Sequence, residues 1–179
     1  MIVQQPLVVD TCVLINLLAT DRLLEISPLI APSLMVCAGV AAESIYLRAL
    51  DPNRQPRQVH LDPLFKRGVL TPCDCANAAE EQMYVNYALE LDDGEAMSLA
   101  IAHARSLPLA TDEKKAKRVI KSNAKHLRVL STTEILYAWA NGRNQAEIKT
   151  VLGMIGIRAR FRPPDDDLLL TWWMRSITR

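Results

Sequence analysis

Short apolar runs alternate along the chain with segments of helical periodicity, and this alternation constrains the fold more than any other feature. The runs interpreted as strands are residues 6–9, 34–37, 69–71, 108–111 and 127–130. Continuous apolar runs are typical of strands buried on both faces, and strands that alternate with helices build parallel sheets. We therefore predict an α/β fold in which helices cover both faces of a parallel sheet of about five strands.

The segments between these runs differ in character. Residues 94–106 are rich in Ala, Leu and Ile on every side, which indicates a buried helix. The polar, Pro-rich residues 51–58 are predicted to form a loop. Further helices are predicted after Asp10 through Leu18, over 40–50 after Gly39, from a cap at Asp62 to Gly68, over 76–91, and in the basic segment between the last two strands.

The pattern changes after residue 130, where three helices are predicted in succession. Ser131 and Glu134 form a capping box for the first, which Gly142 ends, Asn144 caps the second, and the third begins at Asp165 after two prolines. We predict a domain over residues 1–130 and a C-terminal helical extension over 131–179. Trp172 and Trp173 in the last helix indicate that the extension packs on the domain or forms an interface.

The composition excludes several classes of protein. Half of the 179 residues are apolar and 23% are charged, with a formal net charge of +1, as in an ordinary globular domain. No apolar run approaches the roughly 18 residues of a membrane span. The N-terminus lacks the basic residues and the cleavage site of a signal peptide, so we expect a cytoplasmic protein without a membrane partner. The four cysteines lack the spacing of a disulfide framework or a zinc site.

Charge is segregated along the chain. Residues 74–95 contain seven acids and no Lys or Arg, whereas residues 114–128 contain seven bases and no acid. Two interpretations stay open at this point. The two segments are solvated helix faces, or they are an acidic metal pocket and a rim that attracts phosphate.

Four carboxylates lie at the ends of predicted strands or at adjacent helix starts, where α/β sheets carry their reactive groups. Asp10 ends the first strand and Asp112 follows the fourth. Glu43 is expected near the first turn of the helix after the second strand, and Glu95 at the start of the Ala-rich helix. Taken singly, each Asp is also explained as a helix N-cap and each Glu by the helix dipole. Together they would repel one another without a cation, and ligands that are all oxygen favour Mg²⁺ or Mn²⁺.

Four parts of the sequence, taken in order, resemble the PIN-domain nucleases. They are LVVDTCVLINLL, Glu43, LDDGEAMSLAIAHA and LATDEKKAKRV, and the resemblance covers roughly residues 6–130. It implies a helix-covered parallel sheet and an endoribonuclease that uses Mg²⁺ or Mn²⁺ to leave 5′-phosphate and 3′-hydroxyl ends. Many members are VapC-type toxins, so the resemblance also implies an antitoxin partner.

The resemblance assigns catalytic and metal-binding roles by position. It implies that the metal is bound by Asp10, Glu43, Glu95 and Asp112, with Asp93 as an alternative that shares the role of Glu95. Cys12 departs from the family, where Asn or Ser is common, and Glu95 is one methylene longer than the commoner Asp. The candidates for contact with substrate are Thr11, Thr111, Lys114, Lys115 and Arg118.

Other interpretations stay open. The two threonines are also explained by packing and the basic side chains by solvation, and the last helix could serve a homodimer. The domain is alternatively a non-catalytic scaffold that binds metal or RNA and is regulated by a partner. A haloacid-dehalogenase-type phosphatase would use the first-strand Asp as nucleophile, but that class usually has a second acid where this chain has Cys12. For a nuclease we expect single-stranded or structured RNA as substrate.

Overall fold

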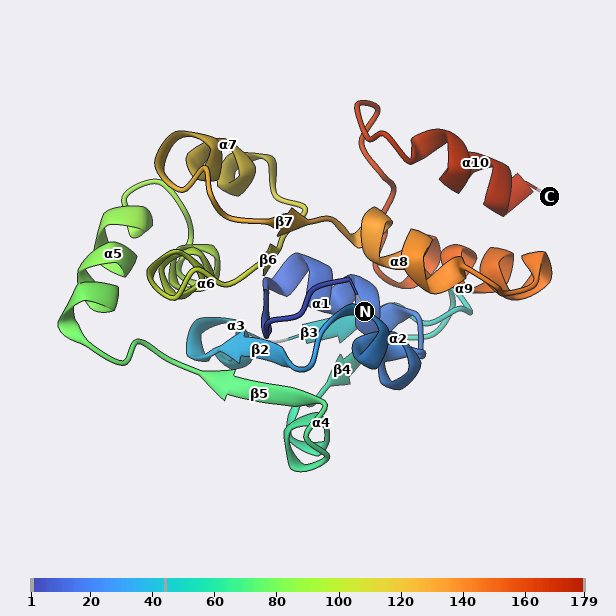
Figure 1. The fold of residues 1–179 in the computed structure, drawn as a ribbon. Helices are drawn as coiled ribbons and strands as arrows, with labels where there is room; N and C mark the ends of the chain where they lie inside the picture. The colour runs from blue at the N-terminus through green and yellow to red at the C-terminus, as the bar shows by residue number, and fades with distance from the viewer. Residues whose placement is uncertain (1, 44, 179) are drawn as a thin grey trace.

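The described part of this computed structural model, residues 2–43 and 45–178, forms a five-stranded sheet in which every neighbouring pair of strands is parallel (Figure 1). The strand order is β5 (Leu70–Cys73), β2 (Leu34–Cys37), β1 (Leu7–Val9), β6 (Leu109–Ala110) and β7 (Val129–Leu130). The strand β1 is therefore central, and the predicted parallel α/β sheet is confirmed.

Helices cover both faces of the sheet, as predicted. One face carries α1 (Thr11–Ala19), α2 (Leu23–Ile30), α8 (Thr132–Ala140) and α9 (Gln145–Arg158), with α10 (Leu170–Thr178) outermost. The other face carries α5 (Ala78–Ala88), α6 (Asp93–Ala104) and α7 (Lys114–Asn123). No helix in the described part of the chain is long and apolar enough to cross a membrane.

Each face of the sheet has its own hydrophobic core. Leu7 and Val9 of β1 belong to the core under α1 and α9, whereas Val8 between them belongs to the core under α6 and α7. All three side chains are fully buried, because successive residues of a strand point to opposite faces and both faces are covered. This double burial is the physical reason for the uninterrupted apolar runs in the sequence.

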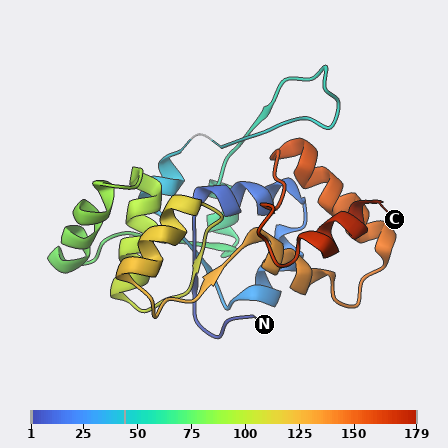
Figure 2. The same ribbon diagram turned by 90° about the horizontal axis from the view of Figure 1, so that it is seen from above.

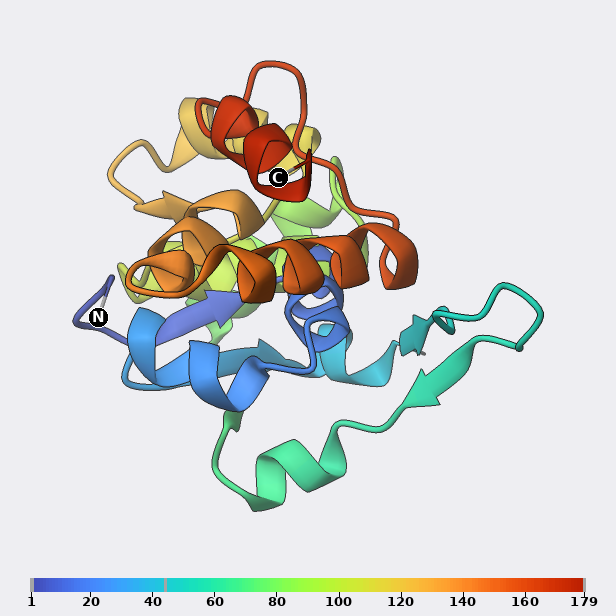
Figure 3. The same cartoon turned by 90° about the vertical axis from the view of Figure 1, so that its right-hand side faces the viewer.

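The helix predicted over residues 40–50 is wrong after residue 42. The helix α3 spans only Ala38–Ala42, and Ile45–Leu47 is a strand, β3, that pairs antiparallel with β4 (Arg57–Val59) in the predicted loop. Ser44 of that predicted helix lies outside the described residues. Burial alternates along β3, with Tyr46 exposed between two buried side chains, which is the period of a half-buried strand. The two strands form an arm that projects from the molecule (Figures 2 and 3).

Two predicted helix starts also need correction. Asp62 is the first residue of α4 (Asp62–Lys66), and the cap position is Leu61, which makes no capping side-chain hydrogen bond. The last helix begins at Leu170 and not at Asp165, because the intervening residues form turns. In one of them the Asp167 carboxylate accepts a hydrogen bond from Leu169 N at 2.7 Å, an interaction that favours a turn over a helix.

The helices after residue 130 pack against the sheet. The predicted capping box of Ser131 and Glu134 and the predicted cap at Asn144 are both present. Trp139 and Ile155 are fully buried in the same core as Leu7, and Trp173 of α10 joins it with 3% of its surface exposed. Residues 131–178 thus complete one side of the sheet, and the domain boundary at residue 130 stays a prediction.

Candidate functional site

A cavity of about 190 Å³ lies at the carboxyl end of β1. Its carboxylates come from four places in the sequence: Asp10, Glu43, the pair Asp92 and Glu95, and Glu113. Thr11, Cys12 and Ile15 of α1 complete the lining, and no Lys, Arg or His belongs to it among the described residues. These side chains meet because parallel strands and the helices that follow them share one edge of the sheet.

Asp10 is the most deeply buried acid of the cavity, with 2% of its surface exposed. It caps α1, as its alternative interpretation predicted: one carboxylate oxygen accepts a hydrogen bond from Thr11 N at 2.6 Å. The other oxygen accepts from Thr111 Oγ1 at 2.8 Å and from Cys12 Sγ at 3.3 Å. Burial raises the pKa of Asp10, and these three hydrogen bonds partly oppose that effect. Asp10 thus caps α1 and lines the cavity at the same time, so the two interpretations of this residue do not exclude each other.

Asp112 is turned away from the cavity. Its two oxygens accept hydrogen bonds from Thr132 N at 3.0 Å and from Asn16 Nδ2 at 3.2 Å, which join β6 to α1 and α8. The N-cap of α7 is Glu113 and not Asp112, so the capping interpretation of Asp112 is wrong. Asp112 lies behind Asp10, and Cys12 Sγ connects the two because it accepts a hydrogen bond from Asp112 N at 3.4 Å.

Glu43 reaches the cavity from the end of α3. It is the C-cap of that short helix, in an extended conformation, rather than a first-turn residue. Thr11 Oγ1 donates a hydrogen bond to Glu43 Oε1 at 2.9 Å. The same oxygen lies against the backbone of Gly94, where no side chain intervenes. Burial, followed by the charges of Asp92 and Asp10, raises the pKa of Glu43.

The start of α6 contributes two acids to the cavity. Asp92 is the N-cap and accepts a hydrogen bond from Glu95 N at 3.2 Å, which places both carboxylates at the cavity. Asp93 does not line the cavity, because its carboxylate accepts a hydrogen bond from Tyr84 at the exposed side of the helix. Burial, together with the charges of Asp92, Asp10 and Glu113, raises the pKa of Glu95 to about 7.

Two of the five cavity acids were not predicted from the sequence. Asp92 carried a usable signal, because an Asp followed three residues later by a Glu is an N-cap pattern. Glu113 carried no such signal, because the sequence does not indicate which of the adjacent acids Asp112 and Glu113 faces the cavity. Burial and the charges of Asp10, Asp112 and Asp92 raise the pKa of Glu113, whereas Lys117 lowers it.

The predicted substrate contacts fall into two groups. The Thr11 and Thr111 hydroxyls hold the carboxylates of Glu43 and Asp10, as described above. The basic side chains lie on the exposed surface of α7, next to the cavity in sequence but outside its lining: Lys114, Lys115 and Arg118. The cation that acts on the acids is Lys117, which lowers the pKa of Asp112 and Glu113.

The chemistry of the cavity fits a hard divalent cation. Its donors are oxygens, its acids raise one another's pKa, and no basic side chain of the described lining neutralises them. Across the described residues, however, no three Asp, Glu, His or Cys side chains are already arranged so that they could hold a metal ion.

One comparison with known proteins identifies a family. A family model described as a PIN domain matches residues 6–166, which includes every carboxylate of the cavity and the helices α8 and α9. No curated protein and no solved structure matches the chain.

Proposed function

This chain belongs to the PIN-domain family, and we propose that it is a divalent-metal-dependent endoribonuclease. The family supports a nuclease-type fold. The observation that carries the finer proposal is the cavity of five carboxylates without a basic neighbour in its described lining. Such a concentration of like charge is costly unless a cation binds there. A scaffold without metal chemistry would have no use for it.

Asp10, Glu43 and Glu95 are the residues proposed to hold Mg²⁺ or Mn²⁺, with Asp92 and Glu113 available beside them. When bound, the cation would supply an activated water and would offset the charge that develops on the phosphate. Asp112, predicted as a ligand, is proposed to act from outside the cavity, because it is not among the residues that line it and its oxygens accept hydrogen bonds from Thr132 and Asn16.

The remaining residues of the site position these carboxylates. Thr111 and Cys12 hold one oxygen of Asp10, and Thr11 holds one oxygen of Glu43. Burial raises the pKa of the Cys12 thiol, so it stays protonated and donates to Asp10 in the place where the family commonly has Asn or Ser. Each hydrogen bond removes rotational freedom from a carboxylate before substrate arrives, which is the preorganisation that such sites need.

The substrate is proposed to be RNA, cut to 5′-phosphate and 3′-hydroxyl ends. The carboxylates alone would repel a phosphate, so attraction has to come from outside the cavity. The exposed cations Lys114, Lys115 and Arg118 of α7 are proposed to supply it, in a manner that depends on salt and not on base sequence. A VapC-type toxin role with an antitoxin partner is a further proposal that rests on the family alone. A homodimer is a further proposal that rests on the two tryptophans of the last helix.

The test is a cleavage assay on single-stranded RNA in which Mg²⁺ or Mn²⁺ is titrated. Asp10→Asn and Glu95→Gln remove two proposed ligands, while Asp93→Asn removes a neighbouring carboxylate that lies outside the cavity. We expect cleavage that requires metal, is lost in the first two variants and persists in the third. Thermal melts establish that all variants are folded.

Each other outcome points elsewhere. Cleavage that survives Asp10→Asn would contradict the proposed site. Metal binding by calorimetry without any cleavage would support the non-catalytic scaffold. An aspartyl-phosphate on Asp10 would support the phosphatase alternative.

A further inference from the structure

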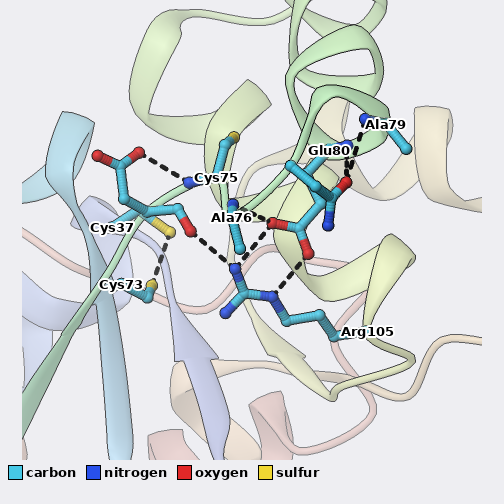
Figure 4. Close-up of polar contacts among 9 residues, drawn as sticks. Cys37, Cys73, Cys75, Ala76, Ala79, Glu80 and Arg105 are labelled. Atoms are coloured by element: carbon cyan, nitrogen blue, oxygen red, sulfur yellow. Dashed lines mark hydrogen bonds and ion pairs between the residues drawn. The ribbon is translucent and has the colours of Figure 1, made fainter.

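Two cysteines lie directly opposite each other on neighbouring strands, away from the carboxylate cavity. Cys37 ends β2 and Cys73 ends β5, and they are register partners in that parallel pair. Their sulfur atoms are 3.3 Å apart (Figure 4). Both are free thiols and both are buried, with 0% and 9% of their surfaces exposed. Neither cysteine takes part in the proposed nuclease reaction.

The surroundings of the two thiols are different. Arg105 lies beside the end of β5, where its guanidinium donates to the carbonyl oxygen of Asp74 at 2.7 Å and pairs with Glu80 (Figure 4). The contact with Cys37, followed by the charge of Arg105, lowers the pKa of Cys73, whereas the contact with Cys73 and burial raise the pKa of Cys37. Cys73, beside the Arg105 guanidinium, is therefore the thiol of the pair that loses its proton more readily.

A disulfide between these residues needs little movement of the backbone. Neighbouring strands in a sheet are about 4.8 Å apart, which falls within the Cα separations of about 4.4–6.8 Å that disulfides span. Cys75 is the alternative partner by sequence, but it lies two residues beyond the register position and is half-buried at the edge of the same core. Cys12 lies in the carboxylate cavity.

We propose that Cys37 and Cys73 form a peroxide-oxidisable pair that closes to a disulfide between β2 and β5. In the first step the Cys73 thiolate attacks hydrogen peroxide: an S–O bond forms, the O–O bond breaks, and the departing hydroxide takes a proton to become water. In the second step Cys37 attacks the sulfenic acid on Cys73. The S–S bond forms, the S–O bond breaks, and the Cys37 proton leaves with the hydroxide as a second water.

The bond would constrain a defined part of the chain. It would close a loop that contains α3, the β3–β4 arm and α4, and it would tie the edge strand β5 to its neighbour. Closing a loop removes conformations from the unfolded chain, so the oxidised protein should unfold at a higher denaturant concentration than the reduced one.

The test uses the full-length folded protein, oxidised with hydrogen peroxide, then unfolded and alkylated. We expect the number of alkylated cysteines to fall from the four in the sequence to two, and a reductant to restore them. Trypsin leaves Cys73 and Cys75 in one peptide because no Lys or Arg lies between Gly68 and Arg105. A protease that cuts before Asp74 separates them and identifies the partner of Cys37 by mass.

Single-cysteine variants test the two oxidation steps and the choice of partner separately. Cys75→Ser is the matched control and should still lose two thiols to the Cys37–Cys73 bond. In Cys37→Ser the oxidation should stop at a sulfenic acid on Cys73, which a dimedone-type probe labels. The proposal is overturned if the folded wild type keeps four thiols, or if the mapped bond joins Cys73 to Cys75 or to a second chain. The wild-type map alone decides the matter if Cys37→Ser fails to fold.

Discussion

Glu43 Oε1 occupies the space that a side chain on Gly94 would need. A Cβ atom placed on Gly94 would lie 2.5 Å from that oxygen, whereas its other neighbours, in Thr11 and Val40, would be at ordinary contact distances of 3.5 Å. The absence of a side chain at Gly94 thus lets a carboxylate from the end of α3 lie against the first turn of α6. Glu43 is thereby held beside the turn that carries Glu95, and both side chains line the cavity.

We expect Gly94→Ala to displace the Glu43 carboxylate without unfolding the protein. Only the end of a flexible side chain has to move, and Ala is favoured over Gly in a helix by about 0.5–1 kcal/mol. RNA cleavage should fall roughly 10- to 100-fold, because small misplacements of reacting groups have effects of that size. Gly153→Ala in α9 is the control, since nothing lies near its Cβ position. Cleavage by Gly94→Ala at the wild-type rate would contradict this role of the contact between Glu43 and Gly94.

The free energy of unfolding should depend on pH through Glu95 when no metal is present. Its pKa is raised from 4.5 to about 7 in the folded protein, so the folded state holds a proton that the unfolded state has released. Stability therefore falls as the pH rises from about 4.5 to about 7. Glu95→Gln should flatten this slope in urea titrations performed in a chelator. An unchanged slope would show that Glu95 does not carry the effect.

Divalent metal should stabilise the protein, and more at pH 8 than at pH 5. Metal competes with protons for the same carboxylates, and these are fully ionised only at the higher pH. At 100 times its Kd, a ligand of the folded state adds about 2.7 kcal/mol. Thermal melts with Mn²⁺ should show a rise in Tm for the wild type and for Asp93→Asn, but little rise for Asp10→Asn. An equal rise in all three proteins would place the metal elsewhere.

Arg105→Met should destabilise the protein near neutral pH. The Arg105 guanidinium donates two hydrogen bonds of 2.8 Å to Glu80, and it holds the pKa of that buried carboxyl at about 2. We expect a loss of about 2 kcal/mol, below the range for a fully buried pair, because Arg105 keeps 28% of its side chain exposed. Arg54→Met, at an exposed ion pair with Asp51, is the control and should change stability by less than about 1 kcal/mol.

The same pair should respond to acid. Because the pKa of Glu80 is lowered from 4.5 to about 2, its contribution to stability is present above pH 4.5 and is lost as the pH falls toward 2. The difference between the wild type and Arg105→Met should therefore shrink over that interval. A difference that stays constant down to pH 2 would contradict the assignment.

The two adjacent tryptophans of α10 should differ in their effect on stability. Trp173 is buried against Phe161, with ring centroids 5.5 Å apart, so Trp173→Ala should cost about 3–5 kcal/mol. Trp172 is half-buried and meets Tyr137 edge-on, so Trp172→Ala should cost about 1–2 kcal/mol. Urea titrations compare them directly. Equal costs would contradict this ranking, and a change of oligomeric state in Trp172→Ala alone would assign Trp172 to an interface.

Structural features that depend on neighbouring residues were mostly predicted correctly from the sequence, and features that depend on distant residues mostly were not. The strands β1 and β2 were predicted nearly to the residue, because burial on both faces demands uninterrupted apolar residues. The arm was missed because Ala41 and Ala42 before it favour a helix. The strand at Ile45 forms because it pairs with Val59 on the other side of a loop, and this pairing is not visible in the residues around Ile45. Periodicity over three residues is too short to distinguish the two.

The sequence by itself determined the parallel α/β fold, the caps of α8 and α9, and the presence of acids where the strands end. These features depend on neighbouring residues, and neighbours are visible in a sequence. Only the tertiary structure decided which acids face the cavity. Adjacent helix positions point about 100° apart, so Asp92 faces inward while Asp93 turns to Tyr84. Asp112 turns toward Asn16 and Thr132 because both donate hydrogen bonds to its carboxylate. These donors belong to α1 and α8, so the local sequence around Asp112 does not reveal its orientation.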